Sequence, residues 1–521
     1  MASNLKAVSR VECPDRAKFP QMTDARIPFA CAALTAAGLY LSGHFGWAWW
    51  LGWIAPVPVL WLAFGRSNPM VALAAALSAA ALAALGQMVP YLGIVSEPTL
   101  GAAVALAGIG FASCVMLARF SARSVSPVAG AIVFAALWTL WDYLAASGPD
   151  GALASPGYSQ AAAPIVIQTA SLYGAWVVTF LIGITSGLAA LAFACRNSLY
   201  LLAAAALFML NVAYGGLHMQ QDQGPERQVV LIDSDALAEA SAIDRRDIAL
   251  GAVLAYAAEI RLEANGANLV VLPERIAILR PEWREMALDY LRAAAVNSGA
   301  TIVAGFEERG PGLSRNIALT ITPDGAAPAA YVQSSLRGTG TNGVSTAISH
   351  DLNFAAAVRM RMAEEQPGFL AIPAWDFGSD GLTESHKAIM RGVESGFAVA
   401  RSARNGRLML ADALGRTVAM KETRSDGFTM LTASLAAGPD AGRTLYDRIG
   451  DTFVWFCALL GLSLVLSGAV RLILDTSPAG DLRARRPRSV PVAAWAMLPA
   501  RARHAAVAKR RGQPGSTMTL H

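Results

Sequence analysis

Charge is the scarcest property of this 521-residue sequence. Only 15% of the residues are Asp, Glu, Lys or Arg, against about 25% in a typical globular protein, and 55% are hydrophobic. A water-soluble domain needs a charged surface, and the first part of the chain cannot supply one, so we expect it to lie in a lipid bilayer. Between Arg26 and Arg196 the only charged residues are Arg66, Glu97, Arg119, Arg123, Asp142 and Asp150.

This distribution excludes a cytosolic soluble enzyme, a disordered chain and a DNA-binding protein. The net charge of +5 does not argue for nucleic acid, because the positive excess lies in the two terminal tails. Asp142 lies near the outer end of an apolar segment, where a charge is costly. It is expected either to face a cavity or to reach toward the surface.

Cysteine is also rare, with five residues in the chain and none between Cys195 and Cys457. No CxxC pair or other metal-ligand spacing is present, so we expect no metal site and no cofactor. The long polar region between these two cysteines therefore contains no thiol for catalysis.

Long apolar runs, in contrast, are abundant. About 20 apolar residues are needed to cross the roughly 30 Å of a bilayer core. Seven such segments precede residue 220 and one follows the polar region, which predicts a membrane bundle of about eight transmembrane helices. Pro56 and Pro58 predict a kink or a break in the second segment, and the sixth is long for one crossing. The segments lie near 27–43, 47–64, 70–91, 99–118, 125–144, 164–194, 198–216 and 452–474.

The basic residues predict the orientation of these segments. Arg follows segments two, four and six, whereas the loops after segments one, three and five contain neither Lys nor Arg. With both termini in the cytoplasm, every basic loop is cytoplasmic and the polar region lies outside. The predicted parts are a cytoplasmic tail (1–26), a seven-helix transmembrane domain (27–217), a periplasmic domain (226–443), a last transmembrane helix (452–474) and a basic cytoplasmic tail (475–521).

The polar region alternates short β-rich runs with amphipathic helical stretches, such as 244–264 and 282–297. Strands that alternate with helices of this length predict a layered α/β domain. About 215 residues can bury a core without help from disulfides. The β-rich runs are QVVLID (228–233), NLVVLP (268–273), ATIVAGF (300–306), NIALTIT (316–322) and FLAIPAW (369–375).

Several motifs follow one another in this part of the chain. In order, they are LVVLPE ending at Glu274, SRNIALTITPDG leading to Tyr331-Val332-Gln333, Ile-Ser-His-Asp (348–351), PAWDFG (373–378), MRGVES (390–395) and TLYDRIGD (444–451). This order resembles the nitrilase (carbon–nitrogen hydrolase) superfamily. Together with the membrane segments, it resembles the apolipoprotein N-acyltransferase family.

The resemblance implies an αββα sandwich on the periplasmic side of a bacterial inner membrane. It implies transfer of an acyl chain from a phospholipid to the N-terminal amine of a lipoprotein, so phospholipid, lipoprotein and the bilayer are the implied partners. In the family, each residue of a Glu–Lys–Cys triad has a separate catalytic role. The Cys thiolate attacks the acyl carbonyl, the Glu moves the proton, and the Lys stabilises the oxyanion and the thiolate.

Two triad positions are substituted in this sequence. Glu274 stands at the general-base position, but Gln333 stands at the Lys position and Ser349 at the Cys position. The arm between the last two is shortened to 337–347, which removes a further acidic residue that the family uses. A Ser hydroxyl is a poor nucleophile unless a base lies in hydrogen-bond reach.

Neighbouring residues do not replace what is lost. Successive residues on a strand point to alternating faces, so Ser349, His350 and Asp351 are not expected to form a relay. The only lysines of residues 226–443 are Lys387 and Lys421.

Four further residues match family positions that would support the site: Asp351, Trp375, Asp376 and Glu394. For Glu394, and for Arg401, an ordinary surface ion pair is an equally good interpretation. For Trp375 and Asp376, the alternative is an ordinary turn.

Two functions therefore remain open. The first is an active acyltransferase or amidase of altered chemistry, with Ser349 as nucleophile, Glu274 as base and Gln333 or Arg337 at the oxyanion. The second is a catalytically impaired relative that binds lipid or a lipoprotein, or that partners another membrane protein. Losing one electrostatic contribution usually costs about a hundredfold in rate. Losing the thiolate as well favours the second function.

Overall fold

The computed structural model describes residues 26–65, 67–93, 95–152, 154–334, 340–377, 381–438 and 444–476. The chain divides into one compact unit that ends at Gly468 and a second, Ala469–His521. The second unit is described only over the end of helix α16 (Thr452–Thr476). The predicted tails, apart from Arg26 and residues 475–476, lie outside the described residues, as does Arg337.

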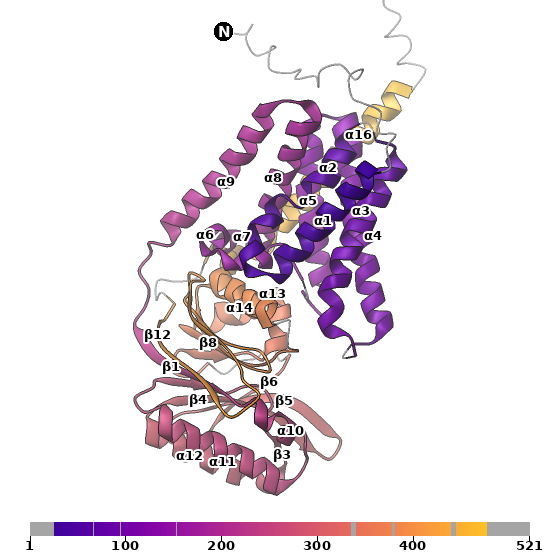
Figure 1. Cartoon of the computed structure of the whole chain (residues 1–521). Helices are drawn as coiled ribbons and strands as arrows, with labels where there is room; N and C mark the ends of the chain where they lie inside the picture. Colours follow the sequence, from indigo (N-terminus) through magenta and orange to yellow (C-terminus); the bar gives the residue numbers. More distant parts are fainter. Residues whose placement is uncertain are drawn as a thin grey trace, which may run out of the picture. The chain divides into compact units, whose positions relative to one another are not determined.

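Eight helical segments of the described chain are long and apolar enough to cross a membrane, which confirms the predicted bundle (Figure 1). Seven precede the strands and one follows them. They are α1 (Arg26–His44), η1 with α2 (Gly46–Trp53 and Val57–Phe64), α3 extended by η2 (Pro69–Met88 and Val89–Tyr91), α4 (Glu97–Ser124), α5 (Pro127–Ala146), α8 (Ala175–Cys195), α9 (Ser198–His218) and α16.

The second segment is interrupted where its prolines predict. The 3-10 helix η1 ends at Trp53, Pro56 occupies the N-cap of α2, and Pro58 lies in the first turn of α2. Proline is tolerated there because the first helical N–H groups have no intrahelical partner.

The sixth predicted segment, which is long for one crossing, contains one spanning helix that covers only its second part. Its first part forms two short helices, α6 (Pro164–Ile167) and α7 (Ala170–Tyr173), and only α8 is long enough to span a membrane. Gly174 separates them with a φ of +73°, and a Cβ atom there would come within 2.8 Å of the Tyr446 ring. The chain turns at a position that only glycine fits.

Two charged side chains of the bundle are buried and hydrogen-bonded. Asp142 accepts hydrogen bonds of 2.7 Å from the hydroxyls of Ser155 and Thr179, so it does not reach the surface. Arg119 donates to the carbonyl oxygens of Ala63 and Ser67, each at 2.6 Å. A cation is stabilised at this place because the carbonyl end of α2 carries partial negative charge.

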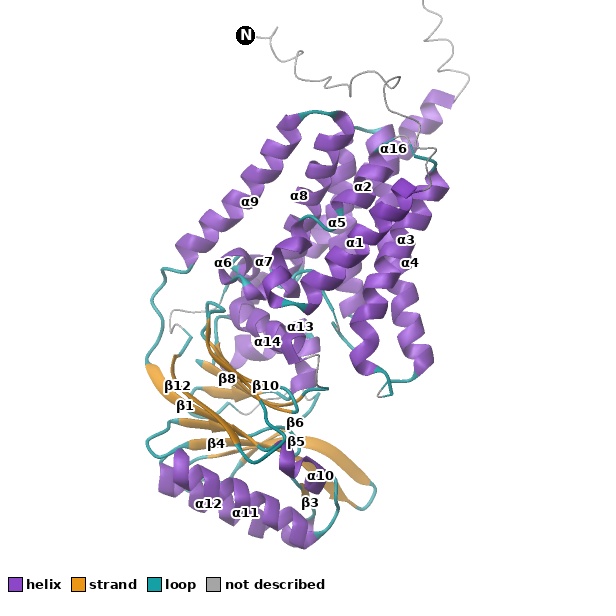
Figure 2. Ribbon diagram, viewed as in Figure 1, coloured by secondary structure: helices purple, strands orange, loops and turns teal. Residues whose placement is uncertain are grey.

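The polar region forms two β-sheets (Figure 2). The seven-stranded sheet has the order β12-β1-β2-β4-β5-β6, with β3 paired to β4, and the five-stranded sheet has the order β11-β10-β9-β8-β7. The strands are β1 (Glu226–Asp233), β2 (Leu269–Val271), β3 (Ile278–Leu279), β4 (Thr301–Gly310), β5 (Leu313–Ile321), β6 (Ala329–Val332), β7 (Val344–Thr346), β8 (Phe369–Trp375), β9 (Ala398–Arg404), β10 (Arg407–Ala411), β11 (Thr417–Glu422) and β12 (Thr429–Ala436).

Helices cover the outer face of each sheet, and alternation along the strands explains the layers. In β1, Val229 and Leu231 pack between the sheets, whereas Val230 and Ile232 pack against the helices α11 (Arg246–Glu263) and α12 (Pro281–Ser298). Both faces of the strand are thus buried. Helices α13 (Ala355–Glu365) and α14 (Gly381–Ser395) cover the second sheet. The expected αββα sandwich is confirmed.

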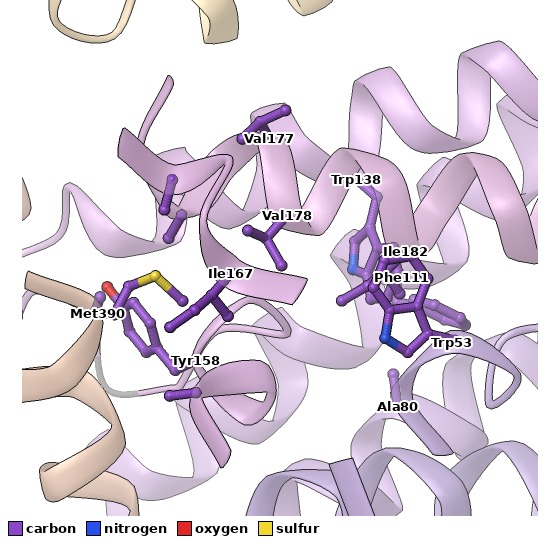
Figure 3. Close-up of a cluster of buried hydrophobic side chains, with 14 of the residues drawn as sticks. Trp53, Ala80, Phe111, Trp138, Tyr158, Ile167, Val177, Val178, Ile182 and Met390 are labelled. Atoms are coloured by element: carbon purple, nitrogen blue, oxygen red, sulfur yellow. The ribbon is translucent and has the colours of Figure 1, made fainter. Parts of the chain in front are cut away.

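The apolar core of the bundle continues into the sandwich. One cluster joins Trp53 and Ile167 of the membrane part to Met390 and Val393 of α14. Figure 3 shows part of this cluster, including Tyr158 of η3 (Tyr158–Ala162). Helix α14 therefore packs against the second sheet on one side and against the membrane part on the other.

Candidate functional site

Glu274 lies just after β2, where the two sheets approach each other. Its backbone N–H donates to the carbonyl of Ala374 in β8 at 3.2 Å. A Cβ atom on Gly305 would come within 2.7 Å of the Glu274 Cα, so β4 can approach this closely only because residue 305 is glycine. The sequence after β2 thus fixes the backbone of Glu274 between strands of both sheets.

The carboxyl group of Glu274 is held by a neighbouring amide. Asn316 of β5 donates from Nδ2 to Oε1 of Glu274 at 2.5 Å. Burial raises the pKa of Glu274 to about 7, and the Asn316 hydrogen bond and the Arg275 charge only partly oppose that rise. The carboxyl group therefore holds its proton to a higher pH than an exposed glutamate does.

Gln333 lies on the other side of Asn316. It follows β6, and its backbone N–H donates to the carbonyl of Asn316 at 3.0 Å. Asn316 therefore contacts Glu274 through its side chain and Gln333 through its backbone. In the described residues no hydrogen bond of the Gln333 side chain is found.

Ser349 begins a 3-10 turn, η5 (Ser349–Asn353), rather than continuing a strand as the sequence analysis assumed. Asp351 anchors this turn beside β6: it accepts hydrogen bonds from the Tyr331 hydroxyl and the Ser334 N–H, both at 2.8 Å, and from the Ile348 N–H at 2.9 Å. Tyr331 and Ser334 flank Gln333 in the chain. The structure thus brings the turn with Ser349, the end of β6 with Gln333, and Glu274 into one region of the sandwich.

No base contacts the Ser349 hydroxyl within the described chain. The residue is buried, yet none of the hydrogen bonds between described residues involves its side chain. His350 is exposed, and its Nδ1 lies 3.3 Å from Nδ2 of Asn353. The expectation that residues 349–351 form no relay holds, but the reason is the 3-10 turn and not strand alternation.

The four predicted supporting residues have different neighbours. Trp375 lies close to two guanidinium groups, with the Arg275 and Arg404 carbons 5.5 and 5.3 Å from its ring centre. Asp376 is fully buried and forms an ion pair with Arg401. Asp351, as described, fixes the turn that carries Ser349.

Glu394 does not contact the three triad-equivalent residues through a hydrogen bond of its own. It is buried in α14, forms an ion pair with Arg391 and accepts the N–H of Ala175 at 2.7 Å. No hydrogen bond between described residues joins it to Glu274, Gln333 or Ser349. Burial of Glu394 and Arg401 shows that the interpretation as surface ion pairs is wrong.

Three contributors were not predicted. Asn316 belongs to the motif SRNIALTITPDG. Its only sequence signal is that it is a polar residue at the start of an otherwise apolar run. Tyr331 was noted only as part of the motif that leads to Gln333. Arg361 of α13 lies with its guanidinium carbon 4.6 Å from the Tyr331 ring centre and donates to the Thr346 carbonyl at 2.6 Å. Nothing in the sequence distinguishes this arginine from an exposed one.

The two lysines of the region do not replace the missing ammonium group. Lys387 is fully buried, and it binds Asn353 and, at 2.8 Å, Glu384. Lys421 donates to the Met430 carbonyl at 3.2 Å in an exposed contact. Neither forms a hydrogen bond with Glu274, Gln333 or Ser349 among the described residues.

Comparison with known proteins matches the membrane part to one family. Residues 35–188 match the profile of the apolipoprotein N-acyltransferase N-terminal domain. The resemblance to apolipoprotein N-acyltransferases is thereby confirmed. A relative with that name from Pseudomonas syringae pv. tomato is 26% identical over 204 residues, which cover 37% of this chain and 39% of the relative. The match thus spans about two fifths of the relative's length.

Two solved structures are each similar to less than half of this chain. A CN-hydrolase superfamily protein from Xanthomonas campestris aligns with 18% identity and a TM-score of 0.32, covering 40% of this chain and 90% of that one. A double mutant of the amidase from Nesterenkonia sp. AN1, in complex with acrylamide, aligns with 17% identity and a TM-score of 0.32, covering 45% of this chain and 99% of that one.

Proposed function

We propose that this chain is an integral inner-membrane protein of the apolipoprotein N-acyltransferase type that binds phospholipid, and a lipoprotein as second partner, but is catalytically impaired. The membrane helices and the resemblance of residues 35–188 support the type. The impairment rests on one observation: the Ser349 hydroxyl has no hydrogen-bonded base within the described chain, while the carboxyl groups of Glu274 and Asp351 are hydrogen-bonded to other residues.

The chemistry of the site explains why this matters. A serine hydroxyl needs a base to become nucleophilic, because its own pKa lies far above neutral pH. Glu274 is bound to the Asn316 amide, and Asp351 accepts three hydrogen bonds that hold the turn. Gln333 can donate a hydrogen bond to an oxyanion but brings no positive charge.

An active enzyme of altered chemistry is the second candidate, and one observation favours it. The pKa of Glu274 is raised by burial to about 7, and a general base works best when its pKa lies near the working pH. In this version Glu274 takes the proton of Ser349, and Gln333 contacts the oxyanion. The third candidate is a non-enzymatic protein that partners another membrane protein.

We expect no acyl transfer by the unmodified chain. The full-length protein, purified in detergent, is incubated with phospholipid and a diacylated lipopeptide, and the product is quantified by mass spectrometry. The rate should equal that of Ser349→Ala, and no acyl ester should form at residue 349. An ester at Ser349 that is lost in Ser349→Ala contradicts the proposal and establishes the second candidate.

A double substitution tests which loss is decisive. Ser349→Cys with Gln333→Lys restores a thiol and an ammonium group, so we expect an acyl adduct on residue 349 that hydroxylamine removes. Ser349→Cys alone should form it at least about a hundredfold more slowly, because the charge at the oxyanion is still missing. If the double variant stays unmodified, the shortened arm at 337–347 is a further cause of impairment.

We also propose the predicted orientation, with the sandwich in the periplasm. Ser126 precedes α5 and Glu263 ends α11, and both are exposed. In intact cells with a permeable outer membrane, a membrane-impermeant maleimide should label Glu263→Cys strongly. It should label Ser126→Cys only after the inner membrane is broken, relative to the parent chain. The reverse pattern contradicts the proposed orientation.

A further inference from the structure

The end of the η5 turn is bound by residues outside the catalytic region. The carbonyl of Leu352 accepts a hydrogen bond from Nε of Arg391 at 3.0 Å. The next residue, Asn353, accepts the Ala152 N–H at 2.8 Å and donates to the Asp150 carbonyl at 3.0 Å. Residues 150–152 follow α5, so the turn that begins with Ser349 ends against a loop of the membrane part.

This loop fits closely around Asn353. Gly151 has a φ of +67°, and a Cβ atom there would lie 2.6 Å from the Asn353 Cβ. Fully buried Lys387 binds the Asn353 side chain from α14. Two cations of one helix, Lys387 and Arg391, therefore both contact the end of the turn.

Arg391 makes two further bonds, and both lead to the membrane part. Its Nη1 pairs with Glu394, and its Nη2 binds the hydroxyl of Tyr158 in η3, whose ring centre lies 5.1 Å from the guanidinium carbon. Glu394 in turn accepts the N–H of Ala175, the first residue of α8. A carboxylate is favoured there because the N-terminus of a helix carries partial positive charge.

All three side chains are buried, with exposed fractions of 1% for Arg391, 1% for Glu394 and 2% for Tyr158. A buried ion pair adds little net stability compared with apolar packing, so its presence needs a reason other than stability. A planar guanidinium can satisfy three acceptors in fixed directions, which an ammonium group on a flexible stem cannot do. Here the three acceptors belong to the turn, to η3 and to the residue that caps α8.

We propose that Arg391 is a positioning residue that couples the Ser349 turn to the membrane helices. Leu352 lies three residues after Ser349 within a single 3-10 turn, so a shift of the Leu352 carbonyl moves the whole turn. A displacement of η3 or of the start of α8 therefore changes the conformation at Ser349. This coupling acts whether or not the site is catalytic, and it extends beyond the proposed function.

The test follows the turn directly in the full-length chain. Hydrogen exchange reports the amides of Asp351 and Phe354, which bond to the Ile348 and Asp351 carbonyls at 2.8 and 3.1 Å. A Ser349→Cys background adds a second readout, the rate at which iodoacetamide alkylates residue 349. Tyr158→Phe removes the hydroxyl that Arg391 binds and keeps the ring, and Arg391→Lys keeps the charge but removes the planar guanidinium.

We expect each substitution to speed exchange at Asp351 and Phe354 by roughly tenfold to a hundredfold, the range of a hydrogen bond to a charged group, and to change the alkylation rate. The matched control is Tyr256→Phe. Tyr256 is equally buried, and its hydroxyl accepts the Ser234 N–H at 3.1 Å in the outer helical layer. This control should leave the turn unchanged.

An internal comparison distinguishes positioning from general loosening. Strand β1 pairs with β12 over residues 226–233 in the seven-stranded sheet, whereas Arg391 lies in α14, which covers the other sheet. If Tyr158→Phe and Arg391→Lys speed exchange equally in β1 and in the turn, or if neither affects the turn, Arg391 does not position it. Faster exchange confined to the turn supports the coupling.

Discussion

Asp376→Ala should lower the free energy of unfolding of the sandwich by about 3–5 kcal/mol, the range found when one partner of a buried ion pair is removed. Asp376 and Arg401 are both fully buried, and the carboxylate also accepts the Arg407 N–H at 3.3 Å. Without it, the Arg401 guanidinium keeps its charge in a place that water does not reach. The loss therefore includes the penalty of removing the carboxylate partner from a buried cation.

The measurement is the midpoint of thermal unfolding of the full-length chain in detergent. For a domain of this size, the expected change corresponds to a shift on the order of 10 °C. The matched control is Asp426→Ala, which removes the carboxylate of the Arg424 pair at 3.0 Å, where both side chains are exposed. Solvent screens that pair, so its removal should leave the midpoint nearly unchanged. If the unfolding midpoint shifts equally in the two variants, burial adds nothing to the cost of losing the carboxylate, and the prediction is wrong.

The membrane bundle could be predicted because one property decides it. A span of about 20 residues with almost no charge has no stable place outside lipid, whatever the rest of the chain does. Sandwich strands such as β1 could also be predicted from the sequence, since a short apolar run between turn signals indicates a strand buried on both faces. In both cases local composition and tertiary environment agree.

The break at Gly174 shows where this agreement ends. The residue looks like any glycine in an apolar segment, and helix-forming residues surround it. Its φ is +73°, and the Tyr446 ring, from a segment 272 positions later, packs where a Cβ atom would be. A contact of that kind decides the local structure and leaves no local signal.

The candidate site was predictable in part for the same reason. Glu274, Gln333 and Ser349 could be named because a motif order pointed to them, and their catalytic roles stay predictions. Asn316, which contacts the first two, could not be named, because its function depends on which strands pair. Glu394 was named as a supporting residue, and that role stays a prediction. It accepts a hydrogen bond from the first residue of a membrane helix, and sequence alone could not place that helix beside α14.

Glu274→Gln should make the protein less sensitive to pH. Burial raises the pKa of the Glu274 carboxyl from 4.5 to about 7 in the folded chain, so the folded state binds this proton more tightly than the unfolded state. The carboxyl therefore favours folding below about pH 4.5, and this contribution is lost as the pH rises through 7. Above pH 7 the buried carboxylate destabilises the fold by up to about 3 kcal/mol, at roughly 1.4 kcal/mol per pKa unit.

The amide that Glu274→Gln introduces would keep the acceptor that Asn316 binds and would remove the titration. We therefore expect this substitution to raise the unfolding midpoint more at pH 8 than at pH 5, with a difference of up to about 3 kcal/mol in unfolding free energy. All other carboxyl groups titrate alike in both proteins, so they cancel in the comparison. Asn297→Gln, at an exposed position of α12 with no titratable group, is the control and should change the midpoint equally at both pH values. If Glu274→Gln instead stabilises the chain more at pH 5, or equally at both, the carboxyl is ionised below neutral pH and cannot serve as a base poised near 7 for Ser349.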